Sequence, residues 1–115
     1  MLIKHFCQNN HKLYPLALWQ TKVENDTMKI GVVGLWHLGE IYSACLAQLG
    51  NTVIGIDTDS KVVANLNRGI VPLPEPDLEK IVAANIKKGR LHYTTDFRSL
   101  KECDVLWITF DTPVD

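Results

Sequence analysis

Residues 29–57 read KIGVVGLWHLGEIYSACLAQLGNTVIGID, and this stretch decides the fold. Residues 30–33 form a short apolar run that ends in Gly34, a pattern typical of a buried parallel strand. After Gly39 the apolar residues recur at helical spacing, and a β-branched run, TVIGI, then ends in Asp57. A strand, a glycine loop, a helix and a second strand make a βαβ unit of about thirty residues.

The remainder of the chain predicts further helices and strands in alternation. One helix is capped by Asp59 or Ser60, and another begins near Pro76 and closes at the basic pair and glycine of residues 87–89. The last expected segments are a strand at residues 92–94, a brief helix at residues 96–101 and a strand at residues 105–110.

Four strands that alternate with helices predict an α/β fold, a Rossmann-like parallel sheet with flanking helices. The sheet is incomplete, because the usual dinucleotide-binding fold orders its strands 3-2-1-4-5-6 and this chain supplies about four of them. The fourth strand is interior in that order, so here it becomes an exposed apolar edge of the kind that pairs with other chains. We therefore expect a fragment that pairs with a missing half or forms a homo-oligomer.

The composition limits the number of domains and the kinds of partner. The 115 residues fit one domain or part of one, and a content of 46% hydrophobic and 22% charged residues predicts a packed core. The 12 basic and 13 acidic side chains are spread along the chain, so we expect neither nucleic acid nor a membrane as a partner. Residues 1–27 show no sustained period and predict a leader of uncertain order, which leaves residues 28–115 as the partial domain.

The cysteines and histidines indicate neither a metal site nor a disulfide framework. Cys7, Cys45 and Cys103 are an odd number at wide spacings, without a CxxC pair. His5 and His11 flank Cys7, but this spacing matches no known ligand pattern and a fourth ligand is missing. We expect no metal, a reducing cytoplasm as the location, and buried apolar packing for Cys45 and Cys103.

The glycine loop suits the pyrophosphate of a dinucleotide. The N-terminus of a helix offers unpaired backbone N–H groups and a partial positive charge, and glycines let the backbone approach the phosphates. Gly34 and Gly39 occupy the first and third positions of the GxGxxG fingerprint, whereas Trp36 occupies the second. The two glycines are weak evidence alone, but the strand before them and the helix after them make the signal more specific.

Asp57 lies about twenty residues beyond the loop, at the end of the next strand, as a ribose-binding carboxylate requires. It is expected to accept hydrogen bonds from the adenosine ribose hydroxyls and to repel a 2′-phosphate, which favours NAD over NADP. The alternative is that Asp57 caps the following helix.

Three side chains around the loop leave the binding of a cofactor open. Trp36 either swings outward over the cofactor or blocks it, and it can instead be a packing residue that closes an empty loop. His37 is expected to contact the cofactor or to be an exposed loop residue. Glu40 lies in the first helical turn, where its charge would sit near the phosphate oxygens and oppose tight binding.

Five segments between Met28 and Asp115 carry a family resemblance: KIGVVGLWHLG, ACLAQLGNTVIGID, LNRGIVPLPEPDLE, KGRLHYTTD and DVLWITFDTPVD. The most specific are EPxL at residues 75–78, GRLxxTTD at residues 89–96 and the pair Thr-Pro at residues 112–113. Together they resemble the N-terminal NAD-binding domain of the UDP-glucose/GDP-mannose dehydrogenases. Residues 1–27 lie outside the resemblance.

The resemblance implies NAD as the cofactor and assigns the residues that bind it. Asp57 would bind the adenosine ribose, and Lys61 is the candidate for the basic residue that the family places a few positions later. The pyrophosphate loop would consist of Gly34, Leu35, Trp36, His37, Leu38 and Gly39. The segment beside the nicotinamide would be Asp111, Thr112 and Pro113, although Thr112 also suits a turn at the end of the strand.

The resemblance further implies that the full-length enzyme serves polysaccharide biosynthesis and oxidises the primary alcohol of a nucleotide sugar to a carboxylate with two molecules of NAD. The catalytic cysteine and lysine of the family lie in later segments, so no catalytic residue is assigned here. A nucleotide-sugar substrate is therefore expected only in a complete enzyme. The alternatives are a noncatalytic nucleotide-binding module and an inactive fragment.

Overall fold

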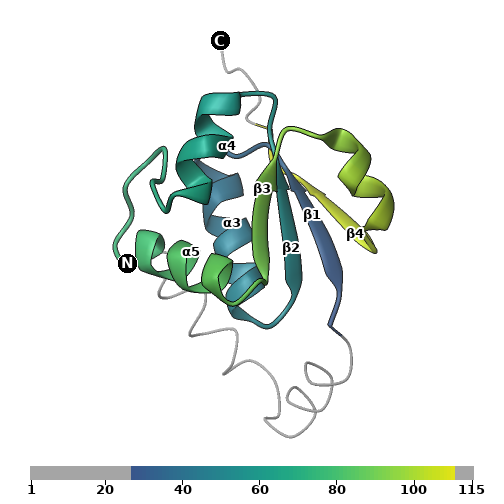
Figure 1. Cartoon of the computed structure of the whole chain (residues 1–115), viewed down its shortest axis with the longest axis horizontal. Helices are drawn as coiled ribbons and strands as arrows, with labels where there is room; N and C mark the ends of the chain where they lie inside the picture. The colour runs from purple at the N-terminus through teal and green to yellow at the C-terminus, as the bar shows by residue number, and fades with distance from the viewer. Residues whose placement is uncertain (1–26, 111–115) are drawn as a thin grey trace, which may run out of the picture.

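The computed structural model describes residues 27–110, and within them four strands form one parallel sheet (Figure 1). The strands are β1 (Lys29–Val33), β2 (Thr52–Ile56), β3 (Leu91–Thr94) and β4 (Val105–Ile108). Their order in the sheet is β3-β2-β1-β4, and all three pairings are parallel. This order corresponds to 3-2-1-4 of the dinucleotide-binding fold, which confirms the predicted Rossmann-like α/β architecture.

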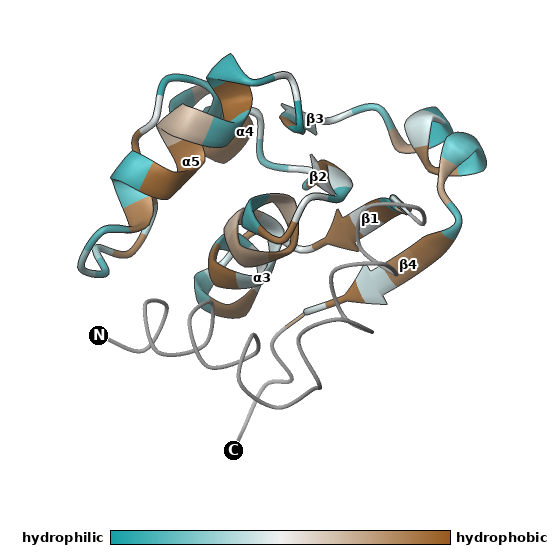
Figure 2. Cartoon of the chain, turned by 90° about the horizontal axis from the view of Figure 1, so that it is seen from below, coloured by the Kyte–Doolittle hydropathy of each residue, from teal (hydrophilic) through white to brown (hydrophobic). Residues whose placement is uncertain are grey.

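The helices lie on both sides of this sheet. Within residues 27–110 the three α-helices are α3 (His37–Gln48), α4 (Ser60–Asn67) and α5 (Leu78–Lys87), and they share one face. A short 3-10 helix, η1 (Phe97–Glu102), lies on the opposite face (Figure 2). Its Leu100 side chain packs over Gly31 of β1. No helix of residues 27–110 combines the length and hydropathy that a membrane crossing requires.

The core lies between the sheet and the α-helices because alternate strand residues point to that face. Its strand members are Ile30, Val32, Val53, Leu91 and Tyr93, and its helical members come from all three α-helices. Cys45 of α3 is fully buried in this core, as expected. Cys103, a free thiol, is half-buried at the end of η1.

β4 is an apolar edge strand. All four of its residues are exposed, from 37% for Trp107 to 66% for Ile108. One contact on the helical face involves Trp107, whose ring centroid lies 4.8 Å from that of Tyr42 in α3. The expectation of an exposed fourth strand is confirmed within the described part of the chain, and its pairing with a partner stays a prediction.

Candidate dinucleotide site

The loop between β1 and α3 is shaped by two glycines. Gly34 has φ 93°, in the region that favours glycine, and its N–H donates to the carbonyl of Ile56 at 2.8 Å. At Gly39, an added Cβ would lie 1.7 Å from the carbonyl oxygen of Gly34. The first turn of α3 therefore approaches the loop at a distance that only glycine permits. These two residues are the first and third glycines of the fingerprint, and they have the expected roles, since Gly34 allows the tight turn and Gly39 allows the close packing of the helix.

The first turn of α3 presents donors without partners. Trp36 is the N-cap residue and makes no side-chain cap, and the first helical bond runs from the N–H of Glu40 to its carbonyl at 2.9 Å. Within residues 27–110, no hydrogen bond is donated by the four preceding backbone N–H groups, those of Trp36, His37, Leu38 and Gly39. Four free N–H groups at the positive end of a helix can hold an anion such as a pyrophosphate.

Asp57 ties the end of β2 to this loop. Its Oδ2 accepts a hydrogen bond from the N–H of Leu35 at 2.8 Å, and its Oδ1 accepts one from the N–H of Asp59 at 2.9 Å. The cap of α4 is Asp59, which accepts from the N–H groups of Lys61 and Val62. The cap alternative for Asp57 is therefore wrong. Each oxygen of a carboxylate has further acceptor capacity, so Asp57 can still bind ribose hydroxyls.

The side chains of Trp36 and His37 are both partly exposed. The Trp36 side chain is 49% exposed, so it is not a packing residue that closes the loop. His37 is the first residue of α3, its side chain is 40% exposed as the alternative interpretation expected, and its Nε2 lies 3.0 Å from Oε1 of Glu75. This contact joins the loop to the EPxL element across 38 positions of sequence. Of the other two loop residues, Leu35 is fully buried and Leu38 is 43% exposed.

Glu40 does not face the phosphate position as expected, because its side chain is fully buried beneath the first turn of α3. Its Oε2 accepts a hydrogen bond from the N–H of Leu73 at 3.3 Å, and its Oε1 has no partner in the described part of the chain. Burial raises the pKa of Glu40 to about 7, against the opposing effects of the Leu73 N–H and of His37. The predicted repulsion of phosphate by a solvated carboxylate is thus replaced by a buried group that titrates near neutrality.

Thr109 is a site residue that the sequence analysis missed. It follows β4 and is buried, and its hydroxyl donates to the carbonyl of Gly34 at 2.6 Å. Its N–H donates to the carbonyl of Val33 at 2.8 Å, which extends the sheet to the edge of the loop. The only signal in the sequence was a hydroxyl residue at the end of a strand that pairs with β1. The adjacent Asp111, Thr112 and Pro113 lie outside the described residues.

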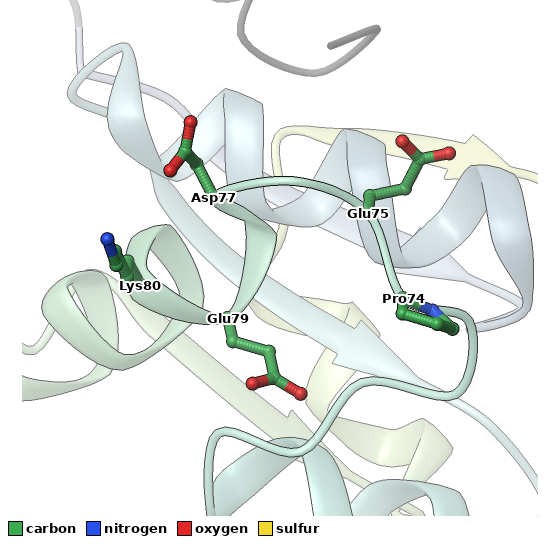
Figure 3. Close-up of a pocket in the computed structure, with 5 residues that line it drawn as sticks. All are labelled: Pro74, Glu75, Asp77, Glu79 and Lys80. Carbon is green, nitrogen blue, oxygen red and sulfur yellow. The ribbon is translucent and has the colours of Figure 1, made fainter.

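A hollow of about 240 Å³ lies beside the start of α5 (Figure 3). Its lining is acidic, and in Figure 3 the carboxylates of Glu75, Asp77 and Glu79 point in different directions. Such a lining does not suit a pyrophosphate, and no group of residues 27–110 is arranged to hold a metal ion. The glycine loop with its free N–H groups, rather than this hollow, is therefore the candidate site.

The alignments with known proteins cover most of this chain but only a small part of each known protein. Residues 28–115 match the family model for the NAD binding domain of the UDP-glucose/GDP-mannose dehydrogenase family. A UDP-glucose 6-dehydrogenase of Rhizobium meliloti is 34% identical, and a GDP-mannose 6-dehydrogenase of Pseudomonas putida is 38% identical. Each alignment covers 75% of this chain but only 20% of the relative. The chain thus spans about one fifth of the length of these curated relatives.

Solved structures agree with the sequence relatives. The crystal structure of a ternary complex of GDP-mannose dehydrogenase from Pseudomonas aeruginosa matches with a TM-score of 0.74 and 36% identity. The match covers 76% of this chain and 20% of that one. A UDP-glucose dehydrogenase from the archaeon Pyrobaculum islandicum matches with a TM-score of 0.69 and 26% identity, over 72% of this chain and 19% of that one. This chain belongs to the UDP-glucose/GDP-mannose dehydrogenase family, through that family's NAD binding domain.

Proposed function

We propose that the loop of residues 34–39 binds the pyrophosphate of NAD. The observation that carries this proposal is the set of four free backbone N–H groups at the start of α3, held against a loop too close for any residue but glycine at Gly39. Two of the four residues, Trp36 and Leu38, are exposed. When bound, NAD would accept a hydride, and the residues of this chain would hold NAD in position.

The assignment of the remaining cofactor contacts follows the polarity of the sheet. Asp57 binds the adenosine ribose with the acceptor capacity that Leu35 and Asp59 leave free, and its negative charge disfavours a 2′-phosphate. Lys61, exposed in the first turn of α4, contributes a contact on the adenosine side. Asp111, Thr112 and Pro113 are proposed as the segment beside the nicotinamide on the pattern of the family, whose NAD binding domain matches residues 28–115.

The complete protein is proposed to be an NAD-dependent 6-dehydrogenase that oxidises a nucleotide sugar to its carboxylate. Two observations support this proposal. The relatives are named as UDP-glucose and GDP-mannose 6-dehydrogenases, and residues 28–115 match the NAD binding domain of that family. No catalytic residue is assigned in this chain. The division into a leader at residues 1–27 and a partial domain at residues 28–115 stays a prediction.

Calorimetric titration of the full chain with NAD, NADP and ADP tests the cofactor proposal. We expect NAD and ADP to bind, because both carry a pyrophosphate and an adenosine ribose with a free 2′-hydroxyl. NADP should bind at least about tenfold more weakly, since its 2′-phosphate meets the Asp57 carboxylate. Equal binding of NAD and NADP would contradict the role of Asp57, and the absence of binding by a folded chain would contradict the site.

A noncatalytic nucleotide-binding module is the second candidate function, and the exposed β4 favours it. Within residues 27–110, β4 pairs only with β1, and an apolar edge strand of this kind can add a strand from a partner chain or from a second copy. Light scattering of the full chain at several concentrations distinguishes the two functions when it is combined with the NAD titration. A stable homo-oligomer that binds NAD supports the module, whereas a monomer that binds NAD contradicts self-pairing.

A cytoplasmic location is also proposed, on the wide spacing of the cysteines. Alkylation after rapid acid quenching of the cells and unfolding of the protein in denaturant tests this location, because Cys45 is fully buried in the native fold. A Cys45 thiol that is alkylated without prior reduction supports the cytoplasm, and one that stays blocked contradicts it.

A further inference from the structure

A buried carboxyl group lies directly behind the proposed pyrophosphate site. Glu40 is in the first turn of α3, the turn whose N–H groups are free, yet none of its surface is exposed. The N–H of Leu73 is its one hydrogen-bond donor, and Oε1 has no partner in the part of the chain that the structure describes. An ionised carboxylate is unfavourable in an interior that offers a single donor, so the neutral form is favoured.

The titratable groups that interact electrostatically with Glu40 come from three places in the fold. His37 precedes it in α3, Glu75 lies in the loop that leads to α5, and Tyr93 is a buried residue of β3. His37 and Glu75 lie 3.0 Å apart and act on the pKa of Glu40 in opposite directions, since His37 lowers it and Glu75 raises it, and both effects are smaller than that of burial. Burial therefore dominates and raises the pKa of Glu40 to about 7, so that Glu40 exchanges its proton near neutral pH.

We propose that Glu40 couples NAD binding to proton uptake, so that the chain binds NAD with Glu40 protonated and binds it more weakly once that proton is lost. This inference rests on the proposed pyrophosphate site. The Glu40 carboxyl and the free N–H groups belong to one helical turn, whose pitch is about 5.4 Å. A pyrophosphate held there repels an ionised Glu40, and the low local dielectric strengthens that repulsion.

The size of the effect follows from linkage. If the bound pyrophosphate raises the pKa of Glu40 by about one unit, the dissociation constant for NAD increases about sevenfold between pH 6 and pH 8.5. Under the same assumption, binding at pH 7.5 takes up about half a proton per NAD. Calorimetry in HEPES and in Tris, two buffers with different ionisation enthalpies, measures this number directly.

Three proteins are compared: the wild-type chain, Glu40→Gln, and the control Glu79→Gln, which removes an exposed carboxylate of α5. We expect proton uptake and weaker binding at high pH for the wild type and the control. Glu40→Gln should take up no proton and should change its affinity less than about twofold over the same range.

Each outcome has a distinct meaning. Proton uptake that persists in Glu40→Gln would assign the proton to another group, such as His37, and overturn the coupling. Wild-type binding without uptake or pH dependence would also overturn it, even if the variant failed to fold. If the folded wild type binds no NAD at any pH, the proposed site fails first and the coupling fails with it.

Discussion

The substitution Glu40→Gln should remove a pH dependence from the stability of the free protein. The pKa of Glu40 rises from 4.5 to about 7 because its side chain is buried, and the Leu73 N–H offsets only part of that effect. Since the folded chain holds the proton more tightly than the unfolded chain, Glu40 stabilises the fold at low pH. That stabilisation is lost as the pH rises from about 4.5 through 7 and changes little above.

The magnitude follows from the shift. About 2.5 pKa units at 1.36 kcal/mol per unit give about 3 kcal/mol in the free energy of unfolding. A glutamine has nearly the same shape and no charge, and any cost of its buried amide is independent of pH. The free energy of unfolding of Glu40→Gln, relative to the wild type, should therefore increase by about 3 kcal/mol between pH 4.5 and pH 8.

Urea unfolding followed by circular dichroism at pH 4.5, 6, 7 and 8 measures this difference without any ligand. The exposed-site variant Glu79→Gln should follow the wild type at every pH, because its carboxylate is solvated in both states. A difference between Glu40→Gln and the wild type that stays constant within about 0.5 kcal/mol would refute the reasoning, since it would show that Glu40 titrates alike in both states.

Three further changes test other contacts. Gly39→Ala places a Cβ 1.7 Å from the Gly34 carbonyl, half of the 3.4 Å at which ordinary contact begins, so NAD binding should be lost in calorimetry; retained affinity would contradict the packing of the loop. Tyr93→Phe removes the hydroxyl that lies 2.9 Å from Ser43 Oγ, and urea unfolding should show a loss of about 1 kcal/mol. Ile108→Lys charges the exposed edge strand and should lower the apparent mass in light scattering; an unchanged mass would exclude self-pairing through β4.

Local patterns in the sequence were sufficient to predict the sheet and the position of its loop. Strand β1, the glycine loop, α3 and β2 follow from apolar periodicity and from two glycines whose steric roles depend on immediate neighbours. The ends of the helices and strands were predicted less accurately. Helix α5 begins at Leu78, after Asp77 adopts φ 67°, and β4 ends at Ile108 rather than at residue 110. Such ends depend on hydrogen bonds and caps that periodicity does not encode.

Several contacts around the candidate dinucleotide site join residues that are far apart in the sequence. Thr109 reaches Gly34 across 75 positions, and Glu75 reaches His37 across 38. The sequence identified Asp57 as a candidate, but only the folded chain reveals that its carboxylate also holds the N–H of Leu35. These pairings arise when strands and loops pack, so no local spacing predicts them.

Glu40 also shows what the sequence predicts and what only the folded structure decides. Its place after Gly39 determined from the sequence that a carboxyl would lie in the first turn of α3, and a solvated charge was the natural expectation. Whether that carboxyl faces solvent or the interior depends on the loop that carries Leu73, which folds over it from 33 residues away. The sequence thus determined which chemical groups surround the loop, and the tertiary structure decided which of them are solvated, because burial depends on what packs against a residue.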